Sequence, residues 1–185
     1  MKLPAIIAKA ITGPALSRMV HRAPDLVIGE PDAPYLKRWY LVPKNPVANI
    51  YLHLILRSDD DRALHDHPWW NVSIILIGGY FEHRIAAGGV ASRTWRGWRS
   101  ITFRAARAAH RLEIDRAHGG AAVTLFITGP RLREWGFHCA QAGWRHWRDF
   151  TAGPNGETVG RGCGEMDDML HAQRDTAKGA RHHVL

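Results

Sequence analysis

Two histidines in the segment His65-Asp66-His67-Pro68 form the pattern in this sequence that most directly suggests chemistry. Side chains two residues apart on an extended strand point to the same face, so the two imidazoles can converge on one ion. Imidazole is a ligand that suits many divalent transition metals. The pattern predicts that His65 and His67 bind a metal ion together. The alternative is a pair of surface histidines on a loop, because twelve histidines in 185 residues produce this spacing by chance.

The segments around this pair predict that it lies where a loop joins a strand. An acidic turn, Ser58-Asp59-Asp60-Asp61, precedes the pair, and the apolar run 69–77 follows it and ends at Gly78-Gly79. Such junctions at the mouth of a barrel commonly hold ligands. A second strand-like segment that bears a histidine, His110, lies further along the chain.

Between residues 47 and 150 the sequence alternates short apolar runs with breaks rich in Gly, Asp and Pro. The predicted strands are 47–57, 69–77, 80–85, 91–95, 99–104, 109–114, 121–128, 132–138 and 145–150. Many short strands at this spacing, without a long helical pattern between them, indicate an all-β sandwich or barrel. No internal repeat is evident, which argues against a propeller or a solenoid.

The order of these motifs resembles that of the cupin family. The first cupin motif is HxH, then Glu three or four residues on, then a glycine after six more. Here HDHPWWNVSIILIGG follows that pattern, with Asn71 or Val72 at the Glu position. The second motif supplies a histidine on a later strand, which His110 matches without the usual preceding proline and glycine. The resemblance covers about residues 50–128 and implies a cupin double-stranded β-helix, a jelly-roll barrel.

Because it lacks this Glu, the sequence resembles the three-histidine branch of that family. The best-known members of this branch are the thiol (cysteine-type) dioxygenases. The stretches LHDH…LIGGYFE and AHRLE…AVTLF carry this likeness. It implies that His65, His67 and His110 bind one divalent metal ion, with Fe(II) favoured and Zn, Ni or Mn as alternatives. The branch also has a catalytic histidine and tyrosine on the strand after the third ligand. Leu125-Phe126-Ile127-Thr128 stands there, so classical cysteine dioxygenation is not expected.

Other side chains are candidates for catalysis or substrate binding. Neutral ligands leave the charge of the metal uncompensated, which favours a small anionic substrate held by arginines. The candidate catalytic residues are Glu82, Asn71 and His53, and the candidate substrate-binding residues are Arg38, Arg57, Arg104 and Trp69. The resemblance alone suggests Arg38 as the arginine that binds a substrate carboxylate. The alternatives are an exposed strand carboxylate for Glu82, a hydrogen-bonded core histidine for His53, and solvated rim positions for the arginines.

Composition bounds the class of protein. With 45% hydrophobic and 23% charged residues, the chain is an ordinary globular one, and no apolar run approaches the roughly 20 residues of a membrane span. A net charge of +8, spread over dispersed arginines, leaves a nucleic-acid partner as a less favoured alternative. Two cysteines make no disulfide framework in a chain of this length, which favours a reducing cytoplasm.

Three regions are expected along the chain. Residues 1–46 form an N-terminal extension with a short helix that packs on the barrel, 47–150 the cupin barrel, and 151–185 a Gly-rich tail. Gly13-Pro14 breaks the apolar start, which favours a short helix over an export signal. The resemblance further implies a homodimer.

Three function classes remain open at the level of the sequence. The first is a metal-dependent oxygenase acting on a small anionic molecule. The second is a non-redox metal-dependent isomerase, lyase or hydrolase. The third is a non-catalytic module that binds a ligand or nucleic acid.

Overall fold

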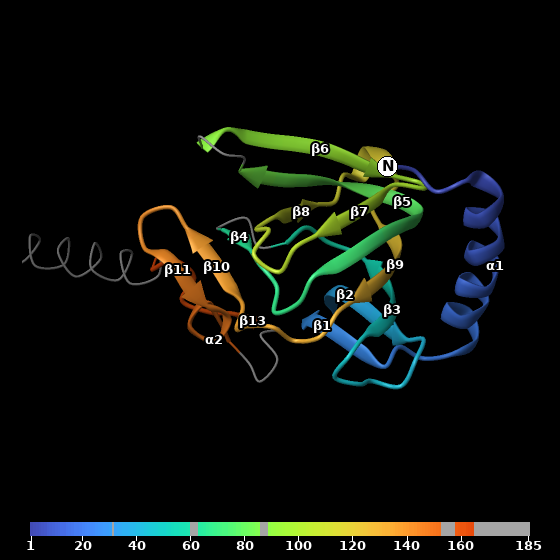
Figure 1. The fold of residues 1–185 in the computed structure, drawn as a ribbon, viewed down its shortest axis with the longest axis horizontal. Helices are drawn as coiled ribbons and strands as arrows, with labels where there is room; N and C mark the ends of the chain where they lie inside the picture. Colours follow the sequence, from blue (N-terminus) through green and yellow to red (C-terminus); the bar gives the residue numbers. More distant parts are fainter. Residues whose placement is uncertain (31, 60–62, 86–88, 153–157, 165–185) are drawn as a thin grey trace, which may run out of the picture.

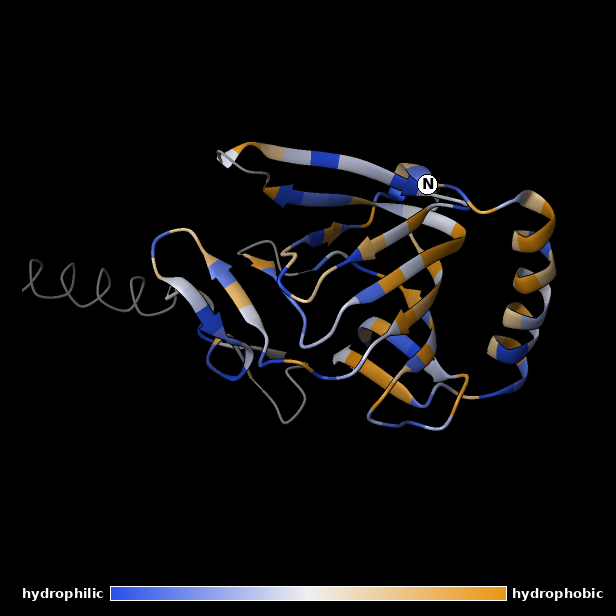
Figure 2. Ribbon diagram, in the orientation of Figure 1, coloured by the Kyte–Doolittle hydropathy of each residue, from blue (hydrophilic) through white to orange (hydrophobic). Residues whose placement is uncertain are grey.

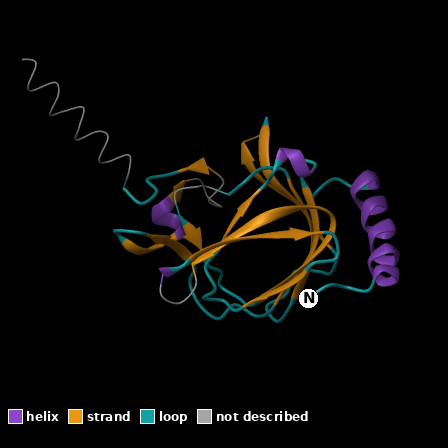
Figure 3. Ribbon diagram, turned by 90° about the horizontal axis from the view of Figure 1, so that it is seen from above, coloured by secondary structure: helices purple, strands orange, loops and turns teal. Residues whose placement is uncertain are grey.

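The computed structural model describes residues 1–30, 32–59, 63–85, 89–152 and 158–164, and its main feature is a curled antiparallel sheet of eight strands. These strands are β1 (Leu26–Glu30), β2 (Ala33–Tyr40), β3 (Asn49–Ile55), β5 (Asn71–Ile85), β6 (Ala91–Gly97), β7 (Ile101–Arg104), β8 (Arg111–Glu113) and β9 (Ala122–Thr128). Their order is β1-β2-β3-β9-β5-β6, and β7 and β8 also pair with β5. Figure 3 shows the sheet curling round on itself, which confirms the expected all-β barrel.

A smaller sheet lies at one end of the barrel (Figure 1). It has the order β11-β10-β4, with β4 at Leu64–His65, β10 at Gly136–Cys139 and β11 at Gly143–His146. The remaining elements are η2 (Arg116–His118), α2 (Trp147–Phe150), β12 (Thr151–Ala152) and β13 (Thr158–Val159). Because β4 carries the first histidine of the pair, this sheet joins the candidate site to the C-terminal hairpin.

Alternation along the strands separates two buried clusters on opposite faces of the large sheet. The cluster inside the barrel contains Leu36, Ile55, Ile75, Tyr80, Leu112 and Ala122. The cluster outside, under the N-terminal helix, contains Ala15, Trp39, Leu52, Leu76 and Val123. Successive strand residues point to opposite faces, so His53, two residues before Ile55, faces the barrel interior.

Helix α1 (Ala5–His21) covers the outer face of the sheet, and Figure 2 shows apolar residues along it. The expected N-terminal helix is confirmed, and it continues through Gly13 and Pro14. A proline inside a helix removes one backbone hydrogen bond. Ala8 and Ala15, on either side of it, are buried against the rest of the protein. Among the described residues, no helix has the length and hydropathy that a bilayer crossing requires.

Strand β5 is one continuous strand where the sequence predicted two, 69–77 and 80–85. A bulge and the positive φ of 63° at Gly78 bend the strand instead of ending it. A Cβ atom on Gly78 would lie 2.1 Å from the carbonyl oxygen of Ala121, so only glycine fits. The bend allows one strand to place buried residues in the barrel on both sides of Gly78.

The expected N-terminal extension contributes strands to the barrel sheet. Strand β2 pairs with β3 in a register that sets Arg38 opposite His53, and β1 continues the sheet beyond β2. The sheet therefore includes residues N-terminal to position 47. Of the expected tail, residues 153–157 and 165–185 lie outside the described residues.

A disulfide links Cys139, at the end of β10, to Cys163. The bond closes a segment with a sequence separation of 24 residues, which includes β11 and α2. The expectation of a reducing cytoplasm rested on the small number of cysteines, and it stays a prediction.

Candidate metal centre

Three imidazoles converge at the end of the barrel next to the small sheet, although His67 and His110 lie 43 residues apart in the sequence. One nitrogen each from His65, His67 and His110 lies within 4.8 Å of the others. The Nε2 atoms of His67 and His110 are 3.5 Å apart. Two nitrogens bound to one metal at about 2.1 Å can be at most about 4.2 Å apart. The donor set therefore fits one ion with small side-chain rotations.

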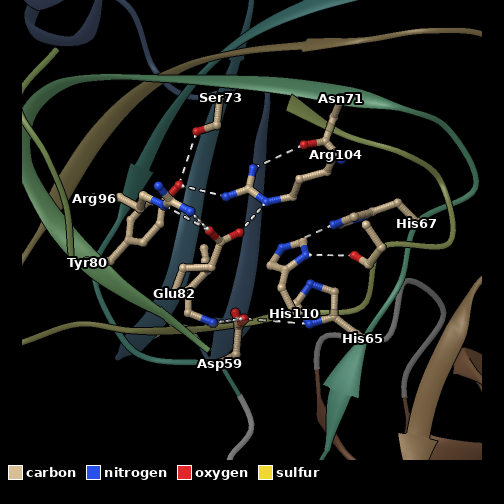
Figure 4. A network of polar contacts seen from close by, with 12 residues as sticks. Asp59, His65, His67, Asn71, Ser73, Tyr80, Glu82, Arg96, Arg104 and His110 are labelled. Atoms are coloured by element: carbon tan, nitrogen blue, oxygen red, sulfur yellow. Dashed lines mark hydrogen bonds and ion pairs between the residues drawn. The ribbon is translucent and has the colours of Figure 1, made fainter. Parts of the chain in front are cut away.

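Backbone pairing brings the two histidine segments together. The backbone N–H of His65 donates to the carbonyl oxygen of His110 at 2.9 Å, and the reverse hydrogen bond has the same length. Two residues further on, the N–H of His67 donates to the carbonyl oxygen of Ala106 at 3.0 Å. The three rings accordingly project toward a common point (Figure 4).

Oxygen atoms lie behind two of the three rings. The Oδ2 atom of Asp59 lies 3.6 Å from Nδ1 of His65, and the carbonyl oxygen of Ala108 lies 3.3 Å from Nδ1 of His110. Oxygen partners at one ring nitrogen fix the ring orientation of metal-binding histidines and leave the other nitrogen for the metal. Both rings thus direct Nε2 toward the shared point.

Asp59 is recognisable in the sequence only as part of an acidic turn. In the structure its carboxylate accepts the hydroxyl of Tyr35 on β2 and the backbone N–H of Leu112 on β8, the latter at 2.6 Å. These partners fix Asp59 beside His65. No local sequence signal reveals this role, because the partners come from strands that are far away in sequence.

Burial lowers the pKa of His67 and of His110 well below the usual value of 6.5. The neighbouring imidazoles and the charge of Arg104 lower the pKa of both rings further. Metal binding requires neutral imidazole, so these shifts keep the ring nitrogens available at neutral pH.

Glu82, a candidate catalytic residue, is fully buried in an ion-pair network beside the histidines (Figure 4). Its Oε1 atom accepts from Nε of Arg104 at 2.7 Å, and its Oε2 atom accepts from Nε of Arg96 at 2.9 Å. Burial raises the pKa of Glu82, but the charges and hydrogen bonds of the two arginines lower it on balance. Glu82 is therefore an ionised carboxylate with both oxygens engaged.

Arg104 connects that carboxylate to the position where the cupin motif has Glu. Its Nη1 donates to Oδ1 of Asn71 at 3.2 Å, and its Nη2 donates to the hydroxyl of Tyr80 at 3.3 Å. The Tyr80 hydroxyl in turn lies 3.2 Å from Oγ of Ser73. Asn71 and Arg104, both candidates from the sequence, are thus buried together beside the histidines, and the guanidinium is bonded on all three nitrogens.

His53 and Arg38 form a second pair inside the barrel. Nε of Arg38 donates to Nε2 of His53 at 2.8 Å, and the guanidinium lies 4.6 Å from the ring centre of Tyr51. Burial, then the charge of Arg38, lowers the pKa of His53 well below 6.5. Since Nε2 accepts this hydrogen bond, the neutral ring carries its proton on Nδ1 and has no free lone pair for a general base.

Two further candidates from the sequence lie in different surroundings. The indole of Trp69 stacks on the ring of His67, with centroids 4.7 Å apart and an interplanar angle of 12°. Phe126 meets the Trp69 ring edge-on at 5.6 Å and stacks on His53 at 4.8 Å, which links the two groups of residues. Arg57, in contrast, is exposed after the end of β3, beside Gly29.

The sequence matches no protein-family model and no curated protein. Solved structures do match. The DMSP lyase DddQ from Ruegeria pomeroyi is 14% identical, with a TM-score of 0.50 over 71% of this chain and 68% of its own. A cupin-like protein from Thermotoga maritima is 13% identical, with a TM-score of 0.46 over 65% of this chain and 88% of its own.

A conserved protein with a double-stranded β-helix domain from Klebsiella pneumoniae is 12% identical, with a TM-score of 0.43 over 60% of this chain and 90% of its own. At these identities the likeness shows the fold alone. The curled antiparallel sheet is the double-stranded β-helix, or cupin, fold that the motifs implied, and the likeness with a TM-score of 0.50 supports this fold.

Proposed function

We propose that this chain, a cupin barrel with three converging histidines, is a metal-dependent enzyme that acts on a small anionic molecule. His65, His67 and His110 would hold the ion. The observation that supports this most strongly is the convergence of three imidazole nitrogens within 4.8 Å, with oxygen atoms behind two of the rings. A chance cluster of surface histidines has no reason to be oriented in this way.

The donor set suits a divalent transition metal, with Fe(II) favoured and Zn, Ni or Mn as alternatives. Three neutral protein ligands leave coordination positions open, which is typical of catalytic metal sites. When bound, such an ion supplies Lewis-acid chemistry and, as Fe(II), chemistry with O₂. The residues of this chain then determine which molecule is held beside it.

Arg38 is the side chain best suited to bind the anion. Its Nε is occupied by His53, but within the described ranges neither Nη group donates to another residue. Burial is the main cause of the lowered pKa of His67, and the charge of Arg38 adds a smaller contribution in the same direction. Arg104, whose charge Glu82 neutralises, would instead keep Asn71 in place. His53 would orient Arg38, and Trp69 with Phe126 would shield the site from water.

An Fe(II)-dependent oxygenase is the reaction class to test first, because neutral histidine ligands and open positions suit O₂ and a substrate side by side. A non-redox lyase or isomerase is the second candidate. Leu125-Phe126-Ile127-Thr128 stands where the thiol dioxygenases have their catalytic histidine and tyrosine, which favours this alternative. The structural neighbour named as a DMSP lyase belongs to the same reaction class.

Metal analysis of protein purified without chelators tests the proposal. We expect a stoichiometric divalent metal, lost in His65→Ala and in His110→Ala while the fold is retained. His83→Ala is a matched control, because His83 pairs with Glu113 outside the cluster. Iron with substrate-dependent O₂ uptake supports the oxygenase, and zinc or nickel without uptake supports the non-redox enzyme. Full metal content in both histidine variants would show that the ligand assignment is wrong.

A further inference from the structure

Asp66, the residue between the first two histidines, is buried with only 1% of its surface exposed. Neighbouring residues on an extended chain point to opposite faces. The imidazoles of His65 and His67 therefore share one face, and the carboxylate of Asp66 points the other way, toward the β10–β11 hairpin. A buried carboxylate is costly unless it is hydrogen-bonded, so its partners indicate what it does.

The hairpin region supplies four partners to this carboxylate. Oδ1 of Asp66 accepts the backbone N–H of Gly136 at 2.9 Å, and Oδ2 lies 3.0 Å from Nε2 of His138. The indole N–H of Trp144 donates to Oδ2 at 3.1 Å, and Nη1 of Arg133 lies 2.6 Å from the same oxygen. The backbone N–H of Asp66 also donates to the carbonyl oxygen of Gly136 at 2.9 Å.

The same segment is fixed on its other side by the barrel. The backbone of His65 exchanges two hydrogen bonds with His110, and the N–H of His67 donates to Ala106. Residues 65–67 are thus held between the barrel and the hairpin, each through main-chain hydrogen bonds. On the hairpin side, the carboxylate of Asp66 adds the four contacts described above, of which the one with Arg133 depends on its negative charge.

We propose that Asp66 is a positioning residue, which fixes the backbone between His65 and His67 so that both imidazoles are oriented before a metal binds. The proposal rests on the function proposed above. A metal site whose ligands are already oriented loses less conformational freedom on binding, which raises its affinity. Because three of the four partners of Asp66 lie on β10 and β11, this hairpin would contribute to the metal centre through Asp66, although none of its residues is a proposed ligand.

The test compares Asp66→Asn and Trp144→Phe with a matched control, Trp147→Phe. Trp144 donates to Asp66, whereas Trp147 stacks on Trp135 in the same region. Two measurements are made on each protein. The first is a Co(II) titration followed by visible absorption. The second is an NMR spectrum of the imidazole nitrogens in the metal-free protein.

We expect Asp66→Asn to weaken Co(II) binding about 10-fold or more, the usual effect of removing a group that orients metal ligands. Trp144→Phe should weaken it less, and Trp147→Phe should leave it unchanged. In the metal-free protein, the imidazole signals of His65 and His67 should shift in the first two variants only. A purely structural role would lower the melting temperature without moving these signals in the folded protein.

Unchanged Co(II) affinity and unchanged imidazole signals in Asp66→Asn would overturn the inference while leaving the metal centre intact. If Asp66→Asn does not fold, the same two measurements on Trp144→Phe decide. If the wild-type protein binds no Co(II) but the imidazole signals still shift, the positioning role stands and the proposed function fails.

Discussion

Two of the three imidazoles have an oxygen atom behind the ring, and the third, that of His67, stacks on Trp69. Asp59 stands behind His65, and the carbonyl oxygen of Ala108 stands behind His110. Burial, rather than any single neighbour, is the main reason why the pKa of His67 is low. At this scale the candidate site consists of three imidazoles, one hydrogen-bonded to a carbonyl oxygen, one beside a carboxylate and one stacked on an indole.

Asp59→Asn should weaken metal binding about 10- to 100-fold, because the neutral amide orients and polarises the His65 ring less strongly. A Co(II) or Zn(II) titration measures this effect. Asp115→Asn is the matched control, since Asp115 also pairs with a histidine, His118, outside the cluster. Equal affinities in the two variants would mean that Asp59 does not support the ligand.

Arg104→Met should destabilise the folded protein by about 3–5 kcal/mol, because it leaves the buried carboxylate of Glu82 without its inner partner. Urea unfolding of the metal-free variant measures the loss. Arg93→Met removes the exposed partner of Glu113 and should change stability little. If Arg104→Met lowers the free energy of unfolding no more than the control does, Glu82 is not a buried carboxylate that depends on Arg104.

The three histidines could be predicted from the sequence, but the residues that contact and orient them could not. HxH spacing and the second motif identify His65, His67 and His110 because a strand gives those residues a fixed direction. Asp66 and Asp59 could not be found in the same way. Their partners, such as Trp144 and Leu112, become neighbours only after the strands have paired.

At the scale of elements, the strands of the barrel follow from the alternating apolar runs, but three details do not. The 26–40 segment forms β1 and β2, although its prolines and basic residues suggested an extension. Pairing with β3 overrides this weak local signal. Gly78 looked like a strand end and is a bend, because its close approach to Ala121 can be judged only in three dimensions.

Helix α2 is the third detail that the sequence did not predict. The run 145–150 was predicted as a strand, yet Trp147–Phe150 forms a short helix that buries Phe150 completely. Its ring stacks on Phe137 of β10, with centroids 3.7 Å apart. Packing of this tertiary kind decides short segments in which helix and strand preferences are nearly equal.

The disulfide between Cys139 and Cys163 should contribute about 3 kcal/mol to stability, as expected for a loop of this length. Cys163→Ala should therefore unfold at lower urea concentration than the wild type under non-reducing conditions. Adding dithiothreitol should bring the wild type close to the variant and leave the variant unchanged. If the wild type is no more stable than Cys163→Ala and dithiothreitol does not destabilise it, the bond does not form in solution.

At the scale of the molecule, one face of the sheet packs on α1, and the other surrounds a barrel interior that is partly polar and partly apolar. The interior near the histidines contains buried Asn71, Glu82 and Arg104, whereas the deeper cluster around Ile75 and Leu112 is apolar. Burying this many polar groups is costly for stability. A functional site is the reason that best accounts for it.

The stability of the metal-free protein should fall as pH falls below about 6.5. Burial lowers the pKa values of His53, His67 and His110 in the folded state, so below the usual value the unfolded chain binds protons that the folded one does not. Each such histidine should contribute a slope of about 1.4 kcal/mol per pH unit. Urea unfolding at pH values of about 8, 7, 6 and 5.5 checks this. A flat profile across that interval would mean that these rings are not buried.

An anomalous-scattering map of crystals grown with the metal that co-purifies is the most direct test of the metal centre. We predict one strong peak within bonding distance, about 2.0–2.3 Å, of a ring nitrogen from each of His65, His67 and His110. A peak elsewhere, or electron density showing the His110 ring turned away from the other two, would contradict the assignment of these three ligands.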